Sequence, residues 1–333
     1  MNARKVLEMG GGTLLVSLPK EWTRKNGIKK GGILEVSELS GRKLLVQPLG
    51  DAQATPKEVV VSYPGDDISQ VTNDITGAYL LGYDIIRVDG KKTITREDRA
   101  RLKATLGRLV GLEIMDEDSK RMTVQFLLES SAIVPEKIVR RMSGLLEGML
   151  RDTEDALAGK DSKLLALVGE RDDEVDRLYF LLVRATRAAV TRPEVSESYG
   201  LTPVDLLDYR VLASFLESVG DAVTELSHRL KDTRGSGALY AEYAECVKVL
   251  RQMNDLATRA FISRRAGKPR TINAEVSGLA RKISDRLAEI ARRFGTQGEG
   301  LAETLGSLDR VSRLLVDVSD LAVITAAVPV GRQ

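Results

Sequence analysis

The C-terminal part of the chain has the hydrophobic pattern of a helical bundle. From Pro135 onward, apolar residues recur at three- and four-residue spacing, the period of helices that bury one face. Short segments containing glycine or proline interrupt this pattern, as connections within bundles do. The pattern predicts an all-α bundle of six helices, grouped most simply as two three-helix units: 135–158, 161–191, 203–232, 238–266, 272–294 and 300–328.

Residues 56–132 have a mixed pattern that predicts a small α+β domain. Short β-branched runs indicate strands, and longer amphipathic segments indicate helices. Asp66 and Asp67 precede the first helix, where carboxylates complement the positive end of the helix dipole, so we interpret them as capping residues rather than catalytic ones. Strands are expected at 57–63, 83–88, 112–115 and 121–127, and helices at 68–81 and 95–110, packed on the sheet.

Residues 1–49 are predicted to form a separate, small β domain. Leu14, Val16 and Leu18 alternate with other residues at the period of a half-buried strand, and Pro19 suits the first position of a helix, where no backbone donor is needed. Glycine-containing turns bracket two further strands, near 33–36 and 43–46. Because so short a unit buries little apolar surface alone, we expect it to pair with a second copy in a homodimer.

Positive charge is concentrated in this first segment. Residues 1–50 contain nine Lys and Arg against four Asp and Glu, a surplus of five, whereas the whole chain has 50 basic and 48 acidic residues and a net charge of +2. A local basic surplus attracts the phosphates of nucleic acids. The residues expected to contact DNA are Arg4, Lys5, Lys20, Arg24 and Lys25. The alternative is a solvated basic rim on a module that only dimerises.

The same segment resembles the AbrB/SpoVT swapped-hairpin family, in which two chains interleave hairpins and present basic residues to DNA. The resemblance implies a DNA-binding homodimer, although Gly12-Thr13 stands where the family often has an arginine. Trp22 lies among the basic residues and either stacks on a base or fills the dimer core, and we favour the core. The matching residues, within 1–49, are Arg4-Lys5-Val6, Gly10, Leu18-Pro19-Lys20-Glu21, Arg24 and Gly27-Ile28.

The composition excludes several classes of protein. The 333 residues, 43% hydrophobic and 29% charged, suit several globular domains, and no apolar run is long enough for a membrane span or a secretory signal, so a cytoplasmic protein without membrane insertion is expected. A single cysteine, Cys246, and a single histidine, His228, leave no internal disulfide and little material for catalytic triads. Gly10-Gly11-Gly12 lacks the Gly-Lys-Ser/Thr ending of a nucleotide-binding loop.

Acidic residues on two predicted helices form a candidate metal site. Asp172 and Asp176 are four residues apart, as are Glu217 and Asp221, so each pair lies on one helical face, with Asp173 beside the first pair. Facing carboxylates favour a hard cation such as magnesium, calcium, manganese or ferric iron. His228, seven residues after Asp221, is either an outer ligand or a surface residue. The alternative for the acids is a solvated face, partnered by Arg171, Arg177 or Arg210.

These helices resemble PhoU. The resemblance covers 135–328 and depends on Asp172-Asp173-Glu174-Val175-Asp176-Arg177-Leu178 and on Leu216-Glu217-Ser218-Val219-Gly220-Asp221-Ala222. It implies metal binding at the acidic pairs and restraint of phosphate uptake through a transporter and its sensor kinase.

A weak internal repeat aligns Asp176 with Asp285 and Val219-Gly220-Asp221 with Val318-Ser319-Asp320. In the second unit, Arg281 and Val316 break the acidic pairs. We therefore expect at most one metal site, in the first three-helix unit.

An AbrB-like module joined to a PhoU-like bundle resembles archaeal regulators of phosphate uptake. The resemblance implies a cytoplasmic, homodimeric, non-enzymatic transcriptional regulator, whose bundle senses phosphate status through a metal, a ligand, or a partner such as the phosphate transporter ATPase or its sensor kinase. The main alternative is an adaptor that does not bind DNA and restrains that transporter or kinase. A third is a metal-dependent enzyme acting on phosphate compounds.

Overall fold

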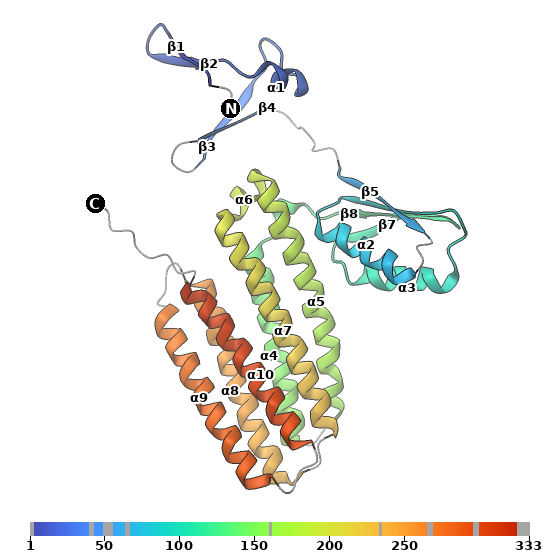
Figure 1. Ribbon diagram of the computed structural model, residues 1–333, viewed down its shortest axis with the longest axis vertical. Helices are drawn as coiled ribbons and strands as arrows, with labels where there is room; N and C mark the ends of the chain where they lie inside the picture. The colour runs from blue at the N-terminus through green and yellow to red at the C-terminus, as the bar shows by residue number, and fades with distance from the viewer. Residues whose placement is uncertain are drawn as a thin grey trace. The chain divides into compact units, whose positions relative to one another are not determined.

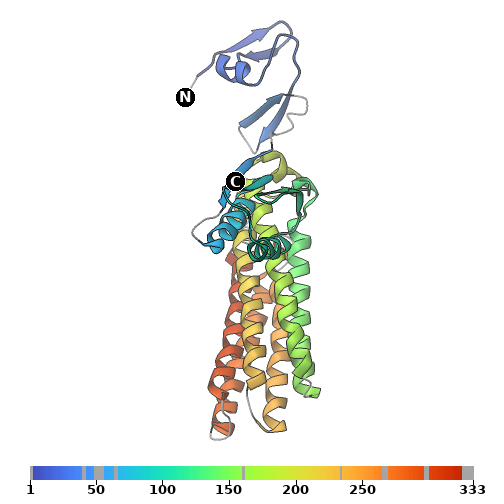
Figure 2. The same cartoon turned by 90° about the vertical axis from the view of Figure 1, so that its right-hand side faces the viewer.

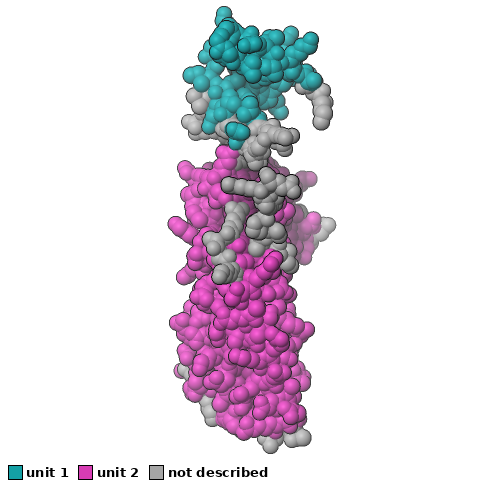
Figure 3. Space-filling view, turned by 90° about the vertical axis from the view of Figure 1, so that its left-hand side faces the viewer, with its two compact units in different colours: residues 1–56 teal, residues 57–333 magenta. Residues whose placement is uncertain are grey.

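The computed structural model describes residues 3–39, 43–48, 56–63, 67–159, 162–232, 235–264, 269–295 and 300–324. The chain divides into two compact units, residues 1–56 (unit 1) and 57–333 (unit 2), coloured separately in Figure 3. Unit 1 consists of hairpins and a short helix, and unit 2 combines an α+β domain with a helical bundle.

Unit 1 contains two antiparallel hairpins. β1 (Val6–Met9) pairs with β2 (Thr13–Val16), and β3 (Leu34–Leu39) pairs with β4 (Lys43–Pro48). The first hairpin turns through Gly11 and Gly12, whose φ angles of 87° and 88° favour glycine. Between the hairpins lies α1 (Lys20–Lys25).

Two predictions for unit 1 were wrong. Pro19 has a ψ of 127° and is the N-cap of α1, so the helix begins one residue later than expected. The strand ends at Val16, before Leu18. Its four residues are exposed in the single chain, where no second copy covers them. β1 was not among the predicted strands, because its four residues are too few to establish an alternating pattern.

The middle domain of unit 2 has the predicted order of elements. β5 (Glu58–Tyr63), β6 (Ile85–Gly90), β7 (Leu112–Glu117) and β8 (Arg121–Phe126) form a sheet in the order β5-β6-β8-β7, in which only β5 and β6 are parallel. α2 (Ile68–Leu80) and α3 (Arg96–Gly107) cover one face (Figure 1). Asp67 caps α2 by accepting a hydrogen bond from the Ser69 backbone, as predicted, whereas Asp66 lies outside the described residues.

The bundle consists of two groups of three helices. α4 (Pro135–Gly159), α5 (Ser162–Thr191) and α7 (Pro203–Asp232) form the first, and α8 (Gly237–Ile262), α9 (Pro269–Phe294) and α10 (Leu301–Ile324) the second. The groups join where α4 packs on α8 and α7 packs on α10, and the long helices run side by side (Figure 2). The predicted end of the last helix, 325–328, lies outside the described residues.

Two short helices were not predicted. η1 (Ser130–Ala132) precedes the bundle, and α6 (Pro193–Tyr199) follows α5. The sequence pattern indicates only a break between helices in the segment that begins at Pro193. It folds as a helix of seven residues that ends at Gly200, whose φ of 62° gives the left-handed C-cap.

A buried arginine attaches the middle domain to the bundle. Arg184, on α5, has a side chain only 3% exposed, and it donates hydrogen bonds to the carbonyl oxygens of Tyr79 and Tyr83 at 2.7 and 2.9 Å. Its guanidinium also contacts Asp84 at 3.4 Å and stacks on the Phe126 ring at 3.7 Å. Burial lowers the pKa of Arg184 to about 10, so the group remains a cation at neutral pH.

Candidate metal centre and basic surface

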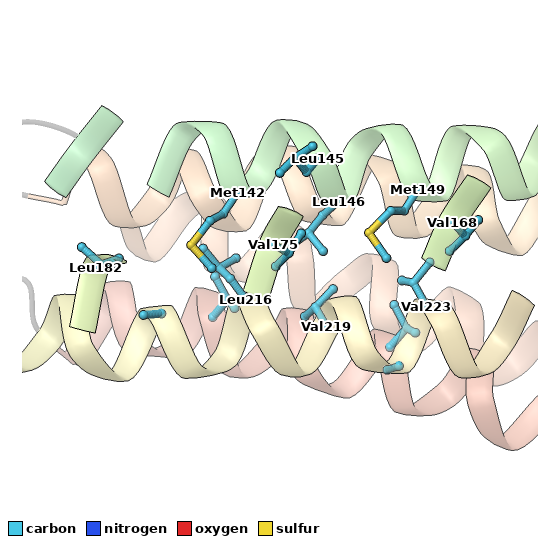
Figure 4. Packing of buried hydrophobic residues seen from close by; sticks show 14 of the residues in the cluster. Met142, Leu145, Leu146, Met149, Val168, Val175, Leu182, Leu216, Val219 and Val223 are labelled. Atoms are coloured by element: carbon cyan, nitrogen blue, oxygen red, sulfur yellow. The ribbon is translucent and has the colours of Figure 1, made fainter. Parts of the chain in front are cut away.

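The packing of α5 against α7 positions the acidic residues. Val175 and Val219 are fully buried and meet side chains of α4 between the three helices (Figure 4). Residues next to such inward positions lie at the flanks of a helix, where they reach the boundary with its neighbour. The acidic residues of α5 and α7 occupy these flanks, so the packing of two apolar stripes sets the distance between the carboxylates.

Three carboxylates gather at this boundary. One oxygen each from Asp176, Glu217 and Asp221 lies within 4.8 Å of the others. Asp176 and Glu217 are partly buried, and Asp221 is exposed. In the described part of the chain this is the one group of three or more acidic, histidine or cysteine side chains that is close enough to hold a metal ion. The group consists of oxygen donors only, which suits a hard cation.

The other two predicted ligands lie outside this group. Asp173 is exposed. Asp172 packs against α7 at Gly220, where a Cβ atom would lie 2.6 Å from its Oδ1 atom, so a larger residue would displace the carboxylate. Burial, together with the neighbouring charges of Asp221 and Asp176, raises the pKa of Asp172 to about 6. Asp172 is therefore a flanking acid that adds negative potential to the group.

Burial and mutual repulsion disfavour the charged forms of Asp176 and Glu217. Burial raises the pKa of Glu217, and the charges of Asp221 and Asp176 add to that shift. Burial also raises the pKa of Asp176, although a hydrogen bond to its carboxylate opposes the change. Carboxylates that repel one another in a partly buried position fit a bound cation, which would remove the repulsion.

Arg108 supplies a positive charge to this group from a different domain. It is the C-cap residue of α3, and its Nη2 atom donates to Oδ2 of Asp176 at 2.5 Å. Its guanidinium also lies 5.8 Å from the centre of the Phe180 ring. Nothing in the local sequence indicates this contact, because 68 residues separate Arg108 from Asp176.

The arginines that were proposed as neutralising partners bond elsewhere. Arg171 pairs with Asp152 at 2.7 Å, Arg177 pairs with Glu174 at 2.7 Å, and Arg210 donates to the hydroxyl of Tyr179 at 3.1 Å. The charge of Arg210 nevertheless opposes the rise in the pKa of Glu217, and Arg108 pairs with Asp176, so arginines neutralise part of the acidic group.

His228 and Cys246 are not part of the acidic group. His228 is exposed near the end of α7, as the surface alternative expected. Cys246 is buried, and burial raises the pKa of its thiol to about 11. In the second three-helix unit, Asp320 instead accepts a hydrogen bond from Asn273 at 2.6 Å.

The basic residues of unit 1 are exposed. Lys20, Arg24 and Lys25 lie on α1, and Lys20 and Arg24 are four residues apart, on one side of the helix. Arg4 and Lys5 precede β1 and are also exposed. Trp22 is partly buried. These positions leave the predicted cations available to a ligand.

Known proteins resemble the two ends of the chain. Residues 139–230 match the family model of the PhoU domain, and residues 9–54 match the model described as "Antidote-toxin recognition MazE, bacterial antitoxin". The crystal structure of PhoU from Pseudomonas aeruginosa has 18% sequence identity and a TM-score of 0.48, over 57% of this chain and 93% of that chain. No curated protein matches the chain. The two family-model matches confirm both resemblances inferred from the sequence. In the described residues, no helix is long and apolar enough to cross a membrane.

Proposed function

We propose that the chain is a homodimeric, DNA-binding regulator of phosphate homeostasis rather than an enzyme. In this proposal unit 1 binds DNA, and the bundle, with its acidic group, responds to phosphate status. The observation that carries the proposal is the surface of unit 1, which combines exposed cations with exposed apolar strands. The PhoU-type and MazE-type matches support the two roles.

The apolar side chains of unit 1 favour a dimer. Val6, Leu14 and Val16 are 59%, 68% and 56% exposed, and Val36 and Leu44 are 58% and 69% exposed. None of the residues that the structure describes between 3 and 48 is buried. A module of this size needs a partner to cover such side chains, and a second copy presents the same strands. The pair would also bring together two basic surfaces, as a palindromic operator requires.

Replacing Lys20 and Arg24 with alanine is expected to weaken DNA binding and its dependence on salt. Removing one cation that neutralises a phosphate lowers the slope of log affinity against log salt by about 0.9, and the dimer would be without four such cations. The slope of log affinity against log salt should therefore be much smaller for the variant. Fluorescence anisotropy with DNA from upstream of the chain's own gene, at several salt concentrations, measures both quantities.

The matched control for this experiment replaces Lys91 and Lys92, which are exposed in the middle domain. It removes the same charge and should leave the slope unchanged. If the unsubstituted chain binds this DNA no more tightly than unrelated DNA, the result would favour the adaptor, in which unit 1 only dimerises. Equal losses in both variants would indicate a general charge effect and would contradict the proposed role of α1.

The acidic group is the proposed sensing element of the bundle. Asp176, Glu217 and Asp221 would hold the cation, which supplies positive charge between α5 and α7. Arg108 competes for the same carboxylate of Asp176, so occupancy would be linked to the position of α3. Such a link transmits a signal only if the cation binds one arrangement more tightly than the other.

Replacing Arg108 with glutamine is expected to raise the affinity for Mn²⁺ about two- to fivefold, because a partly exposed ion pair contributes less than about 1 kcal/mol. The side chains of Arg108 and Asp176 are 52% and 22% exposed, which fits this modest effect. Isothermal titration of the metal-free full chain measures the affinity.

Arg101→Gln is the control for that titration, because Arg101 lies on the same helix and pairs with Glu97 at 2.9 Å, apart from the acidic group. Its affinity for Mn²⁺ should equal that of the unsubstituted chain. Weaker binding by the Arg108 variant alone would mean that the guanidinium holds Asp176 in place for the cation instead of competing with it.

A further inference from the structure

β5 is an open edge of the middle sheet. It pairs with β6 on one side, and in the described residues no strand pairs with its other side. The carbonyl oxygen of Lys57 accepts a hydrogen bond of 3.1 Å from the N–H group of Ile85, at the start of β6, and that of Tyr63 accepts one of 3.1 Å from Lys91, directly after β6. Because alternate residues of a strand direct their backbone groups to opposite sides, the N–H and C=O groups of Glu58, Val60 and Ser62 point away from the sheet.

The two edges of this sheet differ in how they are protected. β7, at the opposite edge, has an irregular register between Ile114 and Asp116 and ends in two acidic residues. Irregularities and charges of this kind discourage pairing with another strand. β5 runs in regular register through Val59-Val60-Val61, and Val60 is 57% exposed. Its one charge, Glu58, is already paired with Arg87 at 2.9 Å. β5 thus keeps an unprotected edge.

A groove lies between this edge and α2. It has a volume of about 520 Å³ and is lined by the central residues of β5 and by one stripe of α2. On α2, the stripe consists of Gln70, Asn73, Asp74 and Gly77, and the C-cap residue Leu81 continues it at the spacing of a single helical face. Leu81 is 60% exposed, and a Cβ atom at Gly77 would meet nothing within 4 Å. The chain's own packing therefore does not require a glycine inside this helix.

We infer that β5 pairs with β5 of a second copy, antiparallel and centred on Val60, to join two four-stranded sheets. The inference rests on the proposed homodimer and names a second surface for it. In this register Val60 faces Val60 of the partner subunit, and each Glu58 faces a serine, so no like charges are opposed. Only residues 49–57 separate β5 from β4, so a dimer of unit 1 would keep the two edges within reach of each other.

The stripe on α2 fits the same arrangement. α2 packs over β5 and β6, and neighbouring strands lie about 4.8 Å apart. If the two β5 strands pair about a two-fold axis, the two copies of α2 would therefore lie about 10 Å apart on either side of that axis. That is the ordinary distance between packed helices, and small residues at the contact permit it. In the described residues, no atom of the same chain fills the space beside Gly77, so the α2 helix of the partner subunit can pack there.

A single cysteine at position 60 tests the pairing in the full chain. Directly opposed residues in a hydrogen-bonded antiparallel pair have Cα atoms about 5.5 Å apart, within the range of a disulfide. With a mild added oxidant, Val60→Cys is expected to convert most chains to a covalent dimer, visible on a non-reducing gel. Met115→Cys is the matched control, because Met115 is 54% exposed on the protected edge strand β7. It should give only background cross-linking. The native Cys246 is buried.

Gly77→Gln, combined with Val60→Cys, provides a second measurement. The substitution adds a better helix former where the chain itself has space, so the thermal midpoint of the protein should not fall, whereas cross-linking should fall severalfold.

Light scattering of the unsubstituted chain separates the two proposals. A monomer would overturn the homodimer, and with it this inference. A dimer whose Val60→Cys variant cross-links no more than the Met115→Cys control would overturn the strand pairing alone and leave the edge to a different strand. Cross-linking that is insensitive to Gly77→Gln would also contradict the packing of the two α2 helices.

Discussion

A chain carrying Arg184→Met is expected to lose about 3 kcal/mol of unfolding free energy, because the substitution removes a buried cation together with its hydrogen bonds. The carbonyl groups of Tyr79 and Tyr83 lose their donors, and the Phe126 ring loses the guanidinium stacked on it. Because these groups belong to the middle domain, that domain should unfold before the bundle. Urea unfolding followed by circular dichroism would then show two transitions instead of one.

Arg187→Met is the control for this measurement. Arg187 lies less than one turn further along α5 and is exposed, so its replacement should change the free energy by no more than about 0.5 kcal/mol. If the two variants have the same stability, then Arg184 does not attach the domains. Destabilisation of the bundle transition alone would place its contribution in the bundle.

Asp176→Asn combined with Asp221→Asn is expected to abolish binding of Mn²⁺ by the full chain. The amides preserve the shape of the side chains but remove two of the three charges in the acidic group. The metal-free variant should be at least as stable as the unsubstituted chain, because like charges at this distance repel one another. Elemental analysis after loading and dialysis measures the metal, and thermal unfolding confirms that the variant is folded.

The control pair, Asp317→Asn with Asp320→Asn, removes the same charge from α10 in the second three-helix unit. Burial raises the pKa of Asp317, and the charge of Asp320 adds to that shift. The carboxylates of this pair therefore also repel each other, but they lie outside the acidic group. Metal retained by the first variant and absent from the control would move the site to the second unit. Metal retained by both would remove the basis for a carboxylate site.

Local pattern predicted most of the fold of unit 2. In the middle domain, alternation and amphipathic periods gave the observed order of strands and helices, because each element buries one face against the same core. The long helices were likewise predicted to within a few residues at most ends. The sequence did not predict α6, because seven residues are too few to show a helical period. Pro193 therefore indicated a break between helices rather than the start of one.

The candidate site was only partly predictable. The four-residue spacing identified Asp176, Glu217 and Asp221, because helical geometry alone places such pairs on one face. The same rule included Asp172, which lies one turn before Asp176 and packs against Gly220, and Asp173 was added as its neighbour; neither belongs to the group of three. Arg108 and Arg184 gave no signal, because their contacts join segments 68 and 105 residues apart in the sequence. Such contacts depend on how the two domains pack.

The close approach of Asp172 to Gly220 has a consequence for the internal repeat. At the corresponding places in the second half of the bundle stand Arg281 and Ser319, so the acid and the glycine are replaced together. The Ser319 side chain is buried and lies 3.3 Å from the amide of Asn273. Among relatives of this chain, the two positions should therefore covary: copies of the repeat that keep the acid should keep the glycine, and copies that lose one should tolerate a side chain at the other.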